Sequence, residues 1–171
     1  MPKIIENVRE QLLGEAKRQI AKKGYGKTTI RSVASACGFG VGTVYNYFKS
    51  KDMLIASFMV EDWQECLSKM EKKSTSDVKD FVENIYLSLR EFAKAHAGLF
   101  CDEDAARVFA AASSDRHKLL CNQLSALLVP KCNHSNREFL AEFIAESLLT
   151  WTMADKSFEE IYSVIKLLLE K

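Results

Sequence analysis

The chain has 171 residues, of which 47% are hydrophobic and 27% charged, and its formal net charge at pH 7 is +1. These proportions suit one or two small globular domains with enough chain for a core. No apolar run reaches the roughly 18 residues of a membrane span, and the N-terminus shows no apolar signal core, so we expect a cytoplasmic protein without a membrane partner.

Glycine and proline are concentrated near the N-terminus. Five of the seven glycines lie between Gly24 and Gly42, and Pro130 is the only internal proline. A remainder so poor in helix-breaking residues, without an alternating strand pattern, predicts an all-α fold. Apolar spacing predicts helices over residues 4–23, 50–72, 77–96, 103–112 and 115–128, besides a short pair between 28 and 48.

Four of the expected helices carry specific terminal signals, including two C-terminal helices that follow residue 135. Gly98 is expected to end the helix over residues 77–96, and Pro130 to stop the helix over residues 115–128. Ser135 and Ser157 each precede a glutamate by three residues, which predicts capping boxes at the starts of two C-terminal helices.

Residues 27–52 predict a DNA-binding helix-turn-helix. Thr28 or Thr29 can cap a first short helix, and Gly38 lies where the chain needs a positive φ to turn. A second short helix follows Val41, with Val44 and Phe48 expected to face the core. Polar and aromatic residues on its other face suit a reader of the major groove.

The charge distribution supports this interpretation. Residues 1–57 carry ten Lys or Arg and four Asp or Glu, a net charge of +6, and the remaining residues carry a net charge of −5. A basic head on an acidic body suits a head that faces phosphate.

The pattern resembles the TetR family of bacterial transcriptional repressors. The resemblance lies in the lead-in from Gly24 to Thr29 and in the run T-V-Y-N-Y-F-K-S-K-D, which starts at Thr43. It covers residues 5–60 and weakens beyond them. Gly40 stands where this family often has a small hydroxyl residue. The resemblance implies a three-helix DNA-binding head over residues 1–52 and a helical regulatory and dimerisation domain over residues 53–171.

Residues that position the head on DNA are distinguished from residues that read its sequence. Amines, hydroxyls and a phenol suit the phosphate backbone, and these are Lys27, Thr28, Thr29, Tyr47, Lys49 and Lys51. Thr43 and Asn46 are expected at base edges, Tyr45 at a sugar or a thymine methyl, and Gly42 allows close approach of the backbone.

The resemblance also implies a homodimer, in which the two C-terminal helices pair with their copies. A protein that recognises a palindromic operator needs matching two-fold symmetry. The expected interface residues are Leu140, Phe143, Ile144, Ser147, Leu148, Trp151, Ile161, Ile165 and Leu168.

In this family a small molecule that fills the helical body usually releases the DNA. Such a ligand lowers DNA affinity by its preference for the state in which the heads are misplaced. Aromatic and sulfur-bearing residues are the candidate pocket lining, although plain core packing is the better explanation for them: Met59, Trp63, Phe81, Tyr86, Phe92, Phe100 and Phe109.

Three alternatives stay open beside a ligand-released repressor. Cys101, Cys121 and Cys132 leave room for a metal- or thiol-sensing regulator, although their spacing matches no zinc finger and buried inert thiols explain them better. A constitutive DNA-binding dimer is the second. An enzyme is the third and is not expected, because the sequence lacks the hydrolase, phosphate-loop and zinc-protease motifs. No cofactor, catalytic residue or metal site is predicted.

Overall fold

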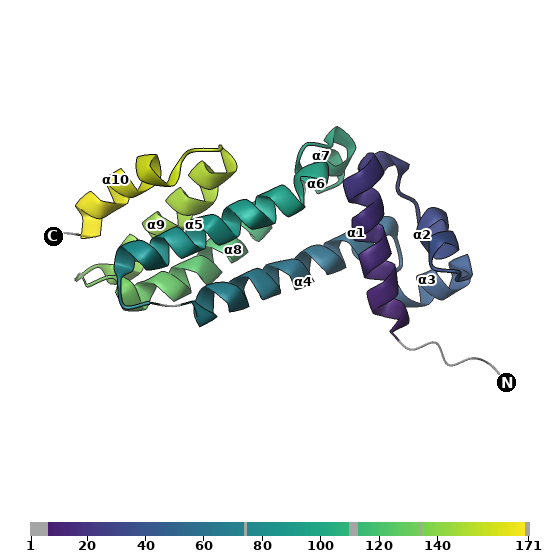
Figure 1. Ribbon diagram of the computed structural model, residues 1–171, viewed down its shortest axis with the longest axis horizontal. Coiled ribbons are helices and arrows are strands. Elements are labelled where there is room, and N and C mark those ends of the chain that lie inside the picture. The colour runs from purple at the N-terminus through teal and green to yellow at the C-terminus, as the bar shows by residue number, and fades with distance from the viewer. Residues whose placement is uncertain (1–6, 74, 110–112, 134, 170–171) are drawn as a thin grey trace. The chain divides into compact units, whose positions relative to one another are not determined.

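The computed structural model describes residues 7–73, 75–109, 113–133 and 135–169, and these fold into helices joined by short turns, with no strand among them (Figure 1). The expected all-α fold is confirmed within these ranges. The helices are α1 (Val8–Lys27), α2 (Ile30–Ala36), α3 (Val41–Tyr47), α4 (Lys51–Lys72), α5 (Val78–Ala95), α6 (Ala97–Phe100), α7 (Glu103–Phe109), α8 (Ser113–Leu128), α9 (Arg137–Met153) and α10 (Phe158–Leu169). None of these described helices is long and apolar enough to cross a membrane.

The chain divides into two compact units. The first contains the described residues of 1–63 and 95–110, and the second those of 64–94 and 111–171. The division falls within α4 and at the end of α5, and the first unit takes in α6 and α7 from later in the sequence. We describe each unit separately below.

The core of the first unit is formed by apolar faces of α1, α2, α3 and the start of α4. Residues of α1 at helical spacing, Leu12, Ala16 and Ile20, are buried as the sequence predicts. Leu99 of α6 and Ala105 of α7 also belong to this core, although both helices come after α5 in the sequence. The first residues of the expected helix over 4–23, up to residue 6, lie outside the described residues.

The core of the second unit is formed by α5, α8, α9 and α10. Its fully or nearly fully buried residues include Phe81, Ile85, Leu89, Leu124, Leu128, Ile144, Leu148 and Ile165. Each such side chain stabilises the fold by about 1.5–3 kcal/mol relative to an exposed one. Helix α8 packs along α9, which is the most extensive helix pair in the molecule.

The predicted terminal signals have mixed outcomes. The Ser157 box is confirmed, because the Ser157 hydroxyl accepts from the Glu160 amide at 3.3 Å and the Glu160 carboxylate accepts from the Ser157 amide at 2.9 Å. The Ser135 box is wrong, because α9 begins after Asn136 without a side-chain cap and Glu138 pairs with Arg137 instead.

Gly98 does not end a helix, since it lies within the short helix α6. Its α-carbon faces the backbone of α1, where an added β-carbon would come within 3.3 Å of the Ile20 carbonyl oxygen. Close approach of two backbones explains this glycine. Pro130 does follow the end of α8, and it sits in a 3₁₀ turn, η2 (Val129–Lys131).

A candidate DNA-binding head

The start of α2 is fixed by a reciprocal cap. The Thr29 hydroxyl accepts from the Ser32 amide at 3.0 Å, and the Ser32 hydroxyl accepts from the Thr29 amide at 3.0 Å. Thr29, rather than Thr28, is therefore the cap, and two amides at the helix start are satisfied.

The turn between α2 and α3 follows the sequence prediction. Gly38 has φ +72°, a left-handed conformation that costs an L-residue strain. The Phe39 amide then donates to the Ala34 carbonyl at 2.9 Å, and α3 begins after Gly40. The two short helices are thereby placed as a helix-turn-helix.

The two faces of α3 differ as the sequence predicts. Val44 and Phe48 are 0% and 3% exposed and belong to the core of the first unit. Tyr45 and Tyr47 are each 47% exposed, and Asn46 between them is also exposed. Gly42 is exposed and Thr43 half-buried on the same short helix. Helix α3 thus exposes the phenol groups of Tyr45 and Tyr47 and the side-chain amide of Asn46 to solvent.

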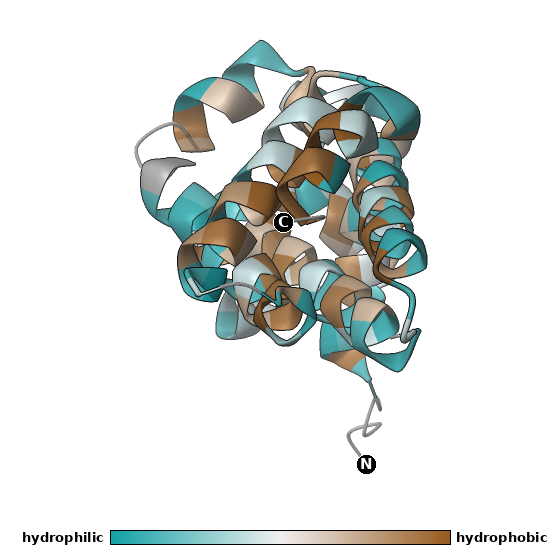
Figure 2. Cartoon of the chain, turned by 90° about the vertical axis from the view of Figure 1, so that its left-hand side faces the viewer, coloured by the Kyte–Doolittle hydropathy of each residue, from teal (hydrophilic) through white to brown (hydrophobic). Residues whose placement is uncertain are grey.

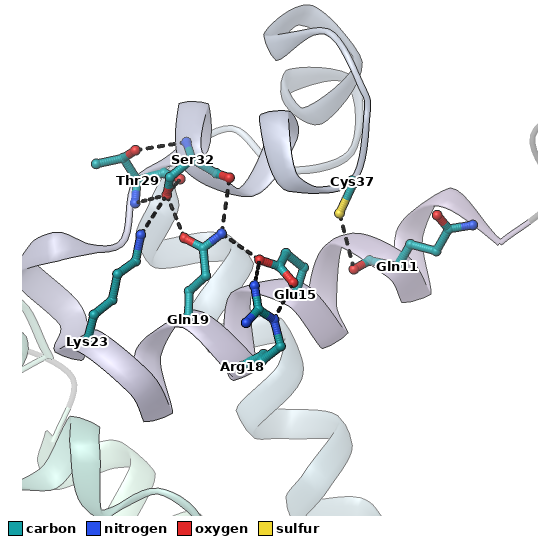
Figure 3. A network of polar contacts seen from close by, with 8 residues as sticks. All are labelled: Gln11, Glu15, Arg18, Gln19, Lys23, Thr29, Ser32 and Cys37. Atoms are coloured by element: carbon teal, nitrogen blue, oxygen red, sulfur yellow. Dashed lines mark hydrogen bonds and ion pairs between the residues drawn. The ribbon is translucent and has the colours of Figure 1, made fainter.

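A polar network holds α2 against α1 (Figure 3). The Gln19 side chain is buried, and its amide nitrogen donates to the Ser32 carbonyl at 3.0 Å and to Glu15 at 2.6 Å. The Ser32 hydroxyl donates to the Gln19 side-chain oxygen at 2.6 Å. Arg18 donates twice to the Glu15 carboxylate, which holds the pKa of that carboxyl below its usual range. These bonds fix where α2 begins, and with it the position of α3.

Four of the predicted phosphate-contacting residues lie exposed on the first unit: Lys27, Thr29, Tyr47 and Lys49. Thr28 does not, since it is 1% exposed and its hydroxyl donates to the Gly24 carbonyl at 2.9 Å. That placement favours a structural role for Thr28, in which its hydroxyl closes the turn after α1, and leaves Thr29 as the better-placed hydroxyl for a phosphate.

Lys51 is half-buried and engaged within the head. Its ammonium nitrogen lies 3.4 Å from the centroid of the Tyr25 ring and donates to the Tyr25 carbonyl at 3.1 Å. A cation held over an aromatic face is stabilised by the ring quadrupole. Lys51 therefore has an internal partner that its position in the sequence does not reveal, and its predicted phosphate contact is less favoured than that of Lys27 or Lys49.

Tyr25 joins three parts of the first unit. Its hydroxyl donates to Asp52 Oδ1 at 2.5 Å, and its backbone amide donates to Asp102 Oδ2 at 3.2 Å. Burial, reinforced by the Asp52 carboxylate, raises the pKa of the Tyr25 phenol well above its ordinary value. Asp102 also accepts from the amides of Asp104 and Ala105, so backbone hydrogen bonds hold its pKa low.

Sequence reasoning missed one candidate DNA contact. Arg31 is an exposed guanidinium in the first turn of α2, two residues after the cap at Thr29. Its position beside an exposed helix start suits a phosphate, since arginine binds phosphate in two-pronged geometry. The signal was available in the sequence, because a basic residue in the first turn after a predicted N-cap marks such a position.

The candidate pocket residues are divided between the two units. Met59, Trp63, Phe100 and Phe109 belong to the first unit, whereas Phe81, Tyr86 and Phe92 belong to the second. Several serve the core: Phe81 is fully buried, and the buried Tyr86 donates its hydroxyl to the Lys156 carbonyl at 3.0 Å. Neither unit gathers the whole set, so the ligand pocket stays a prediction.

The candidate interface residues separate into two groups. Ile144, Leu148, Ile161 and Ile165 are buried within the second unit, so these four side chains serve its own core rather than an interface. Phe143, Trp151 and Leu168 are exposed, and Leu140 and Ser147 are half-buried. Exposed apolar residues missed by the sequence prediction extend this group: Phe139, Met153, Val164 and Leu167. Brown residues surround the marked C-terminus in Figure 2.

The cysteines considered as sensors have different surroundings. Cys101 is exposed in the first unit, whereas Cys132 is buried in the second, where burial raises the pKa of its thiol. His134, two residues after Cys132 in the sequence, lies outside the described residues. Cys121 has polar partners on two helices, and these are described below.

Known proteins resemble this chain most closely in its head. Residues 12–58 match the family described as bacterial regulatory proteins, tetR family. An HTH-type transcriptional repressor of Mycobacterium tuberculosis is 36% identical over 66 residues, which are 36% of this chain and 35% of that protein. The fatty acid metabolism regulator protein of Bacillus subtilis is 30% identical over 70 residues, which are 41% of this chain and 34% of that protein.

Three curated relatives match this chain, and the matched segments cover between 17% and 35% of the length of each relative. A solved structure extends the likeness of fold to the rest of the chain. GusR of Salmonella enterica has a TM-score of 0.70 at 17% identity, over 99% of this chain and 100% of that one. The head of this chain, with its helix-turn-helix in α2 and α3, is therefore similar to the DNA-binding head of the tetR family of bacterial regulatory proteins.

Proposed function

We propose that this protein is a homodimeric repressor that binds a palindromic operator through α3 and acts without catalysis. One observation carries the proposal: α3 buries Val44 and Phe48 while it exposes Tyr45, Asn46 and Tyr47. An exposed amide can pair with the edge of adenine in the major groove, where each base pair presents a distinct pattern. The phenols can reach the sugar-phosphate backbone on either side.

Phosphate contacts supply affinity and its dependence on salt. Lys27, Thr29, Arg31 and Lys49 are exposed around α2 and α3. Each cation that neutralises a phosphate releases condensed counterions, so the logarithm of the affinity falls with the logarithm of salt by about 0.9 per contact. Removing one such cation reduces that slope and weakens binding to every sequence alike.

DNA-binding variants test the reader assignment. Binding of the full chain to DNA from upstream of its own gene is measured by fluorescence anisotropy at two salt concentrations. We expect Asn46→Ala to reduce the preference for the operator over scrambled DNA, whereas Lys49→Ala lowers both affinities and the salt slope. Tyr47→Phe, which removes only a hydroxyl, should weaken binding about threefold to tenfold.

Lys72→Ala is the matched control, because Lys72 is an exposed lysine at the end of α4, in the second unit. It should leave the salt slope unchanged. Binding that has no sequence preference, or that is unaffected by Asn46→Ala and Tyr47→Phe together, would contradict the assignment of α3 as the reader.

The dimer is supported by the apolar face that the second unit leaves uncovered. On α9, Phe139, Phe143 and Trp151 are exposed at spacings of four and eight residues, which place them along one side of the helix. Val164 and Leu167 are exposed on α10. Contiguous exposed apolar residues on a soluble protein mark an interaction surface, and a second copy supplies the two-fold symmetry that a palindrome requires.

Sedimentation velocity tests this interface. The wild-type chain should sediment at twice its 19.3 kDa mass. Phe143→Glu should shift it to a single chain, whereas Leu87→Glu, at an exposed leucine of α5, should leave the dimer intact. A wild-type protein that stays monomeric at the concentrations of the DNA experiment would refute the dimer.

We propose in addition that a small molecule bound by the helical body releases the protein from DNA. The name of the fatty acid metabolism regulator protein of Bacillus subtilis suggests fatty acids as first probes. A probe that raises the melting temperature and lowers operator affinity would support release. A constitutive dimer is the alternative, and it predicts DNA binding that no such probe changes.

A further inference from the structure

A cluster of three metal-ligating side chains lies between α8 and α9 in the second unit. His117 and Cys121 are four residues apart on α8, which places them on one face of that helix, and Glu146 faces them from α9. The imidazole nitrogen Nε2 lies 2.7 and 2.8 Å from the two Glu146 oxygens. The Cys121 sulfur lies 2.8 Å from Glu146 Oε2 and 3.7 Å from His117 Nε2.

We propose that His117, Cys121 and Glu146 form a binding site for a divalent transition-metal ion, with Zn²⁺ as the ion that fits best. Imidazole, thiolate and carboxylate are the three side-chain ligands that Zn²⁺ uses in proteins. The thiolate disfavours hard ions such as Mg²⁺ and Ca²⁺, which prefer oxygen ligands. Thiolate and carboxylate together also balance the two positive charges of the ion.

The distances fit a tetrahedral ion after a small movement of one side chain. Metal–ligand bonds of about 2.0–2.3 Å place neighbouring tetrahedral ligand atoms about 3.3–3.8 Å apart. The separation of 3.7 Å between the Cys121 sulfur and His117 Nε2 already lies in that range. The Glu146 oxygens are closer than that, and Glu146 is exposed, so its carboxylate can withdraw to admit the ion.

The surroundings of the cluster support the same site. The Thr150 hydroxyl donates to Glu146 Oε1 at 3.1 Å, an outer contact of the kind that orients a ligating carboxylate. Within a single chain Cys121 is buried, whereas His117 is half-buried and Glu146 exposed, so an ion reaches the site of an undimerised chain from solvent. Three protein ligands leave a fourth position open for water or for another ligand.

Binding replaces a hydrogen bond with a metal bond. Without metal, the Cys121 thiol keeps its proton and donates it to Glu146, and burial together with that carboxylate raises the pKa of the thiol to about 12. When the ion binds, the S–H bond breaks, the proton leaves to solvent, and the sulfur electron pair is donated to the metal. The site uses residues of the second unit only.

Cobalt is the spectroscopic probe for the test. The reduced, metal-free full chain is titrated with Co²⁺ and then with Zn²⁺. We expect one Co²⁺ per chain, with a near-ultraviolet band from thiolate-to-cobalt charge transfer and visible d–d bands, all of which Zn²⁺ removes by displacement. Zn²⁺ should also raise the melting temperature, because it joins α8 to α9.

Variants assign the ligands. Cys121→Ser should lose the charge-transfer band, and His117→Gln and Glu146→Gln should each weaken Co²⁺ binding by at least about tenfold. Cys101→Ser, at an exposed thiol of the first unit, should keep the wild-type spectrum. If Cys121→Ser does not fold, the His117→Gln and Glu146→Gln variants show whether the site binds metal. Neither of these side chains is buried, so both variants are expected to fold.

Two results would overturn the site. One is a wild-type titration that shows no saturable charge-transfer band, which would leave the three residues as a hydrogen-bonded cluster alone. The other is a band that persists at unchanged affinity in Cys121→Ser, or in both His117→Gln and Glu146→Gln, which would place the metal elsewhere.

Discussion

The hydroxyl of Tyr25 is the sharpest test of what holds the first unit together. Tyr25→Phe removes one oxygen atom, keeps the ring under the Lys51 ammonium, and leaves the backbone bond to Asp102 in place. The lost interaction is the 2.5 Å hydrogen bond from the phenol to the Asp52 carboxylate, which ties the end of α1 to the first turn of α4.

The magnitude follows from the burial of each partner. A hydrogen bond to a charged group contributes about 1.5–3 kcal/mol. Tyr25 is buried, but Asp52 is only half-buried and recovers part of its hydration when the phenol is removed. We therefore expect Tyr25→Phe to lower the free energy of unfolding by about 1–2 kcal/mol, toward the lower end of that range. Tyr47→Phe, at an exposed phenol of α3, should change it by less than about 0.5 kcal/mol.

The pH dependence gives an independent check with a defined sign. The pKa of the Tyr25 phenol is raised in the folded state, so its stabilisation is fully present below the unfolded value of about 10 and is lost as pH rises toward the folded value. Above pH 10 the wild type should lose about 1.4 kcal/mol per pH unit relative to Tyr25→Phe. The stability gap between the two proteins should accordingly nearly close at pH 11.

Urea unfolding followed by circular dichroism at pH 7, 9 and 11 measures both effects. A Tyr25→Phe protein as stable as the wild type at pH 7 would show that the hydrogen bond from Tyr25 to Asp52 makes no net contribution to the free energy of unfolding. A gap that is present at pH 7 but unchanged at pH 11 would show that the phenol ionises as freely in the folded state as in the unfolded one.

Three further predictions concern helix starts, turns and the network of Figure 3. Gly14→Ala should stabilise α1 by about 0.5–1 kcal/mol, since its added β-carbon meets nothing within 4 Å, whereas Gly38→Ala, equally unobstructed but at φ +72°, should cost about 1–2 kcal/mol in urea unfolding. Hydrogen bonds from the Ser157 amide and hydroxyl lower the pKa of Glu160 to about 2 from 4.5, so the difference in melting temperature between wild type and Glu160→Gln should be constant above pH 5 and shrink as pH falls toward 2. Gln19→Leu removes three hydrogen bonds of a buried amide and should cost about 1–3 kcal/mol.

The head is readable from sequence because its signals are local. The cap at Thr29, the left-handed glycine at position 38 and the inward face of α3 are each set by residues within a few positions of one another. Backbone sterics and helical periodicity decide such features before any tertiary contact forms. The same holds for the Ser157 box, where both partners lie within one turn.

The roles of Thr28 and Lys51 were not readable in this way. A hydroxyl and an ammonium suit a phosphate, but they equally suit a nearby carbonyl oxygen or an aromatic ring, and sequence alone does not say which partner is nearer. Lys51 lies over Tyr25, 26 residues earlier, and Tyr25 in turn bonds Asp102, 77 residues later. Only the packed fold brings these partners together. The chemistry of a residue therefore predicts which partners are possible, but not which of them it contacts.

The cluster of His117, Cys121 and Glu146 shows the same division within one site. The spacing of four residues between His117 and Cys121 was visible in the sequence and places both on one face of a helix. The sequence does not distinguish Glu146 from the other glutamates. It becomes the third ligand only because α8 packs against α9 and brings Glu146 next to His117. Because one of the three ligands is non-local, the sequence offered Cys121 among the candidate sensor cysteines but not the site that it forms with Glu146.

Helix α9 explains why the predicted interface mixed core and surface residues. Successive residues of a helix are rotated by about 100°, so Phe143 and Ile144 point to different sides although they are neighbours in an apolar run. The structure separates them: Ile144 is fully buried, and Phe143 is 45% exposed. A charge at position 144 would therefore unfold the second unit, and loss of the dimer in that variant would carry no information about the interface. The outward residues Phe143 and Trp151 are the positions at which a monomer can be produced from a folded chain, which is why the interface has to be tested there.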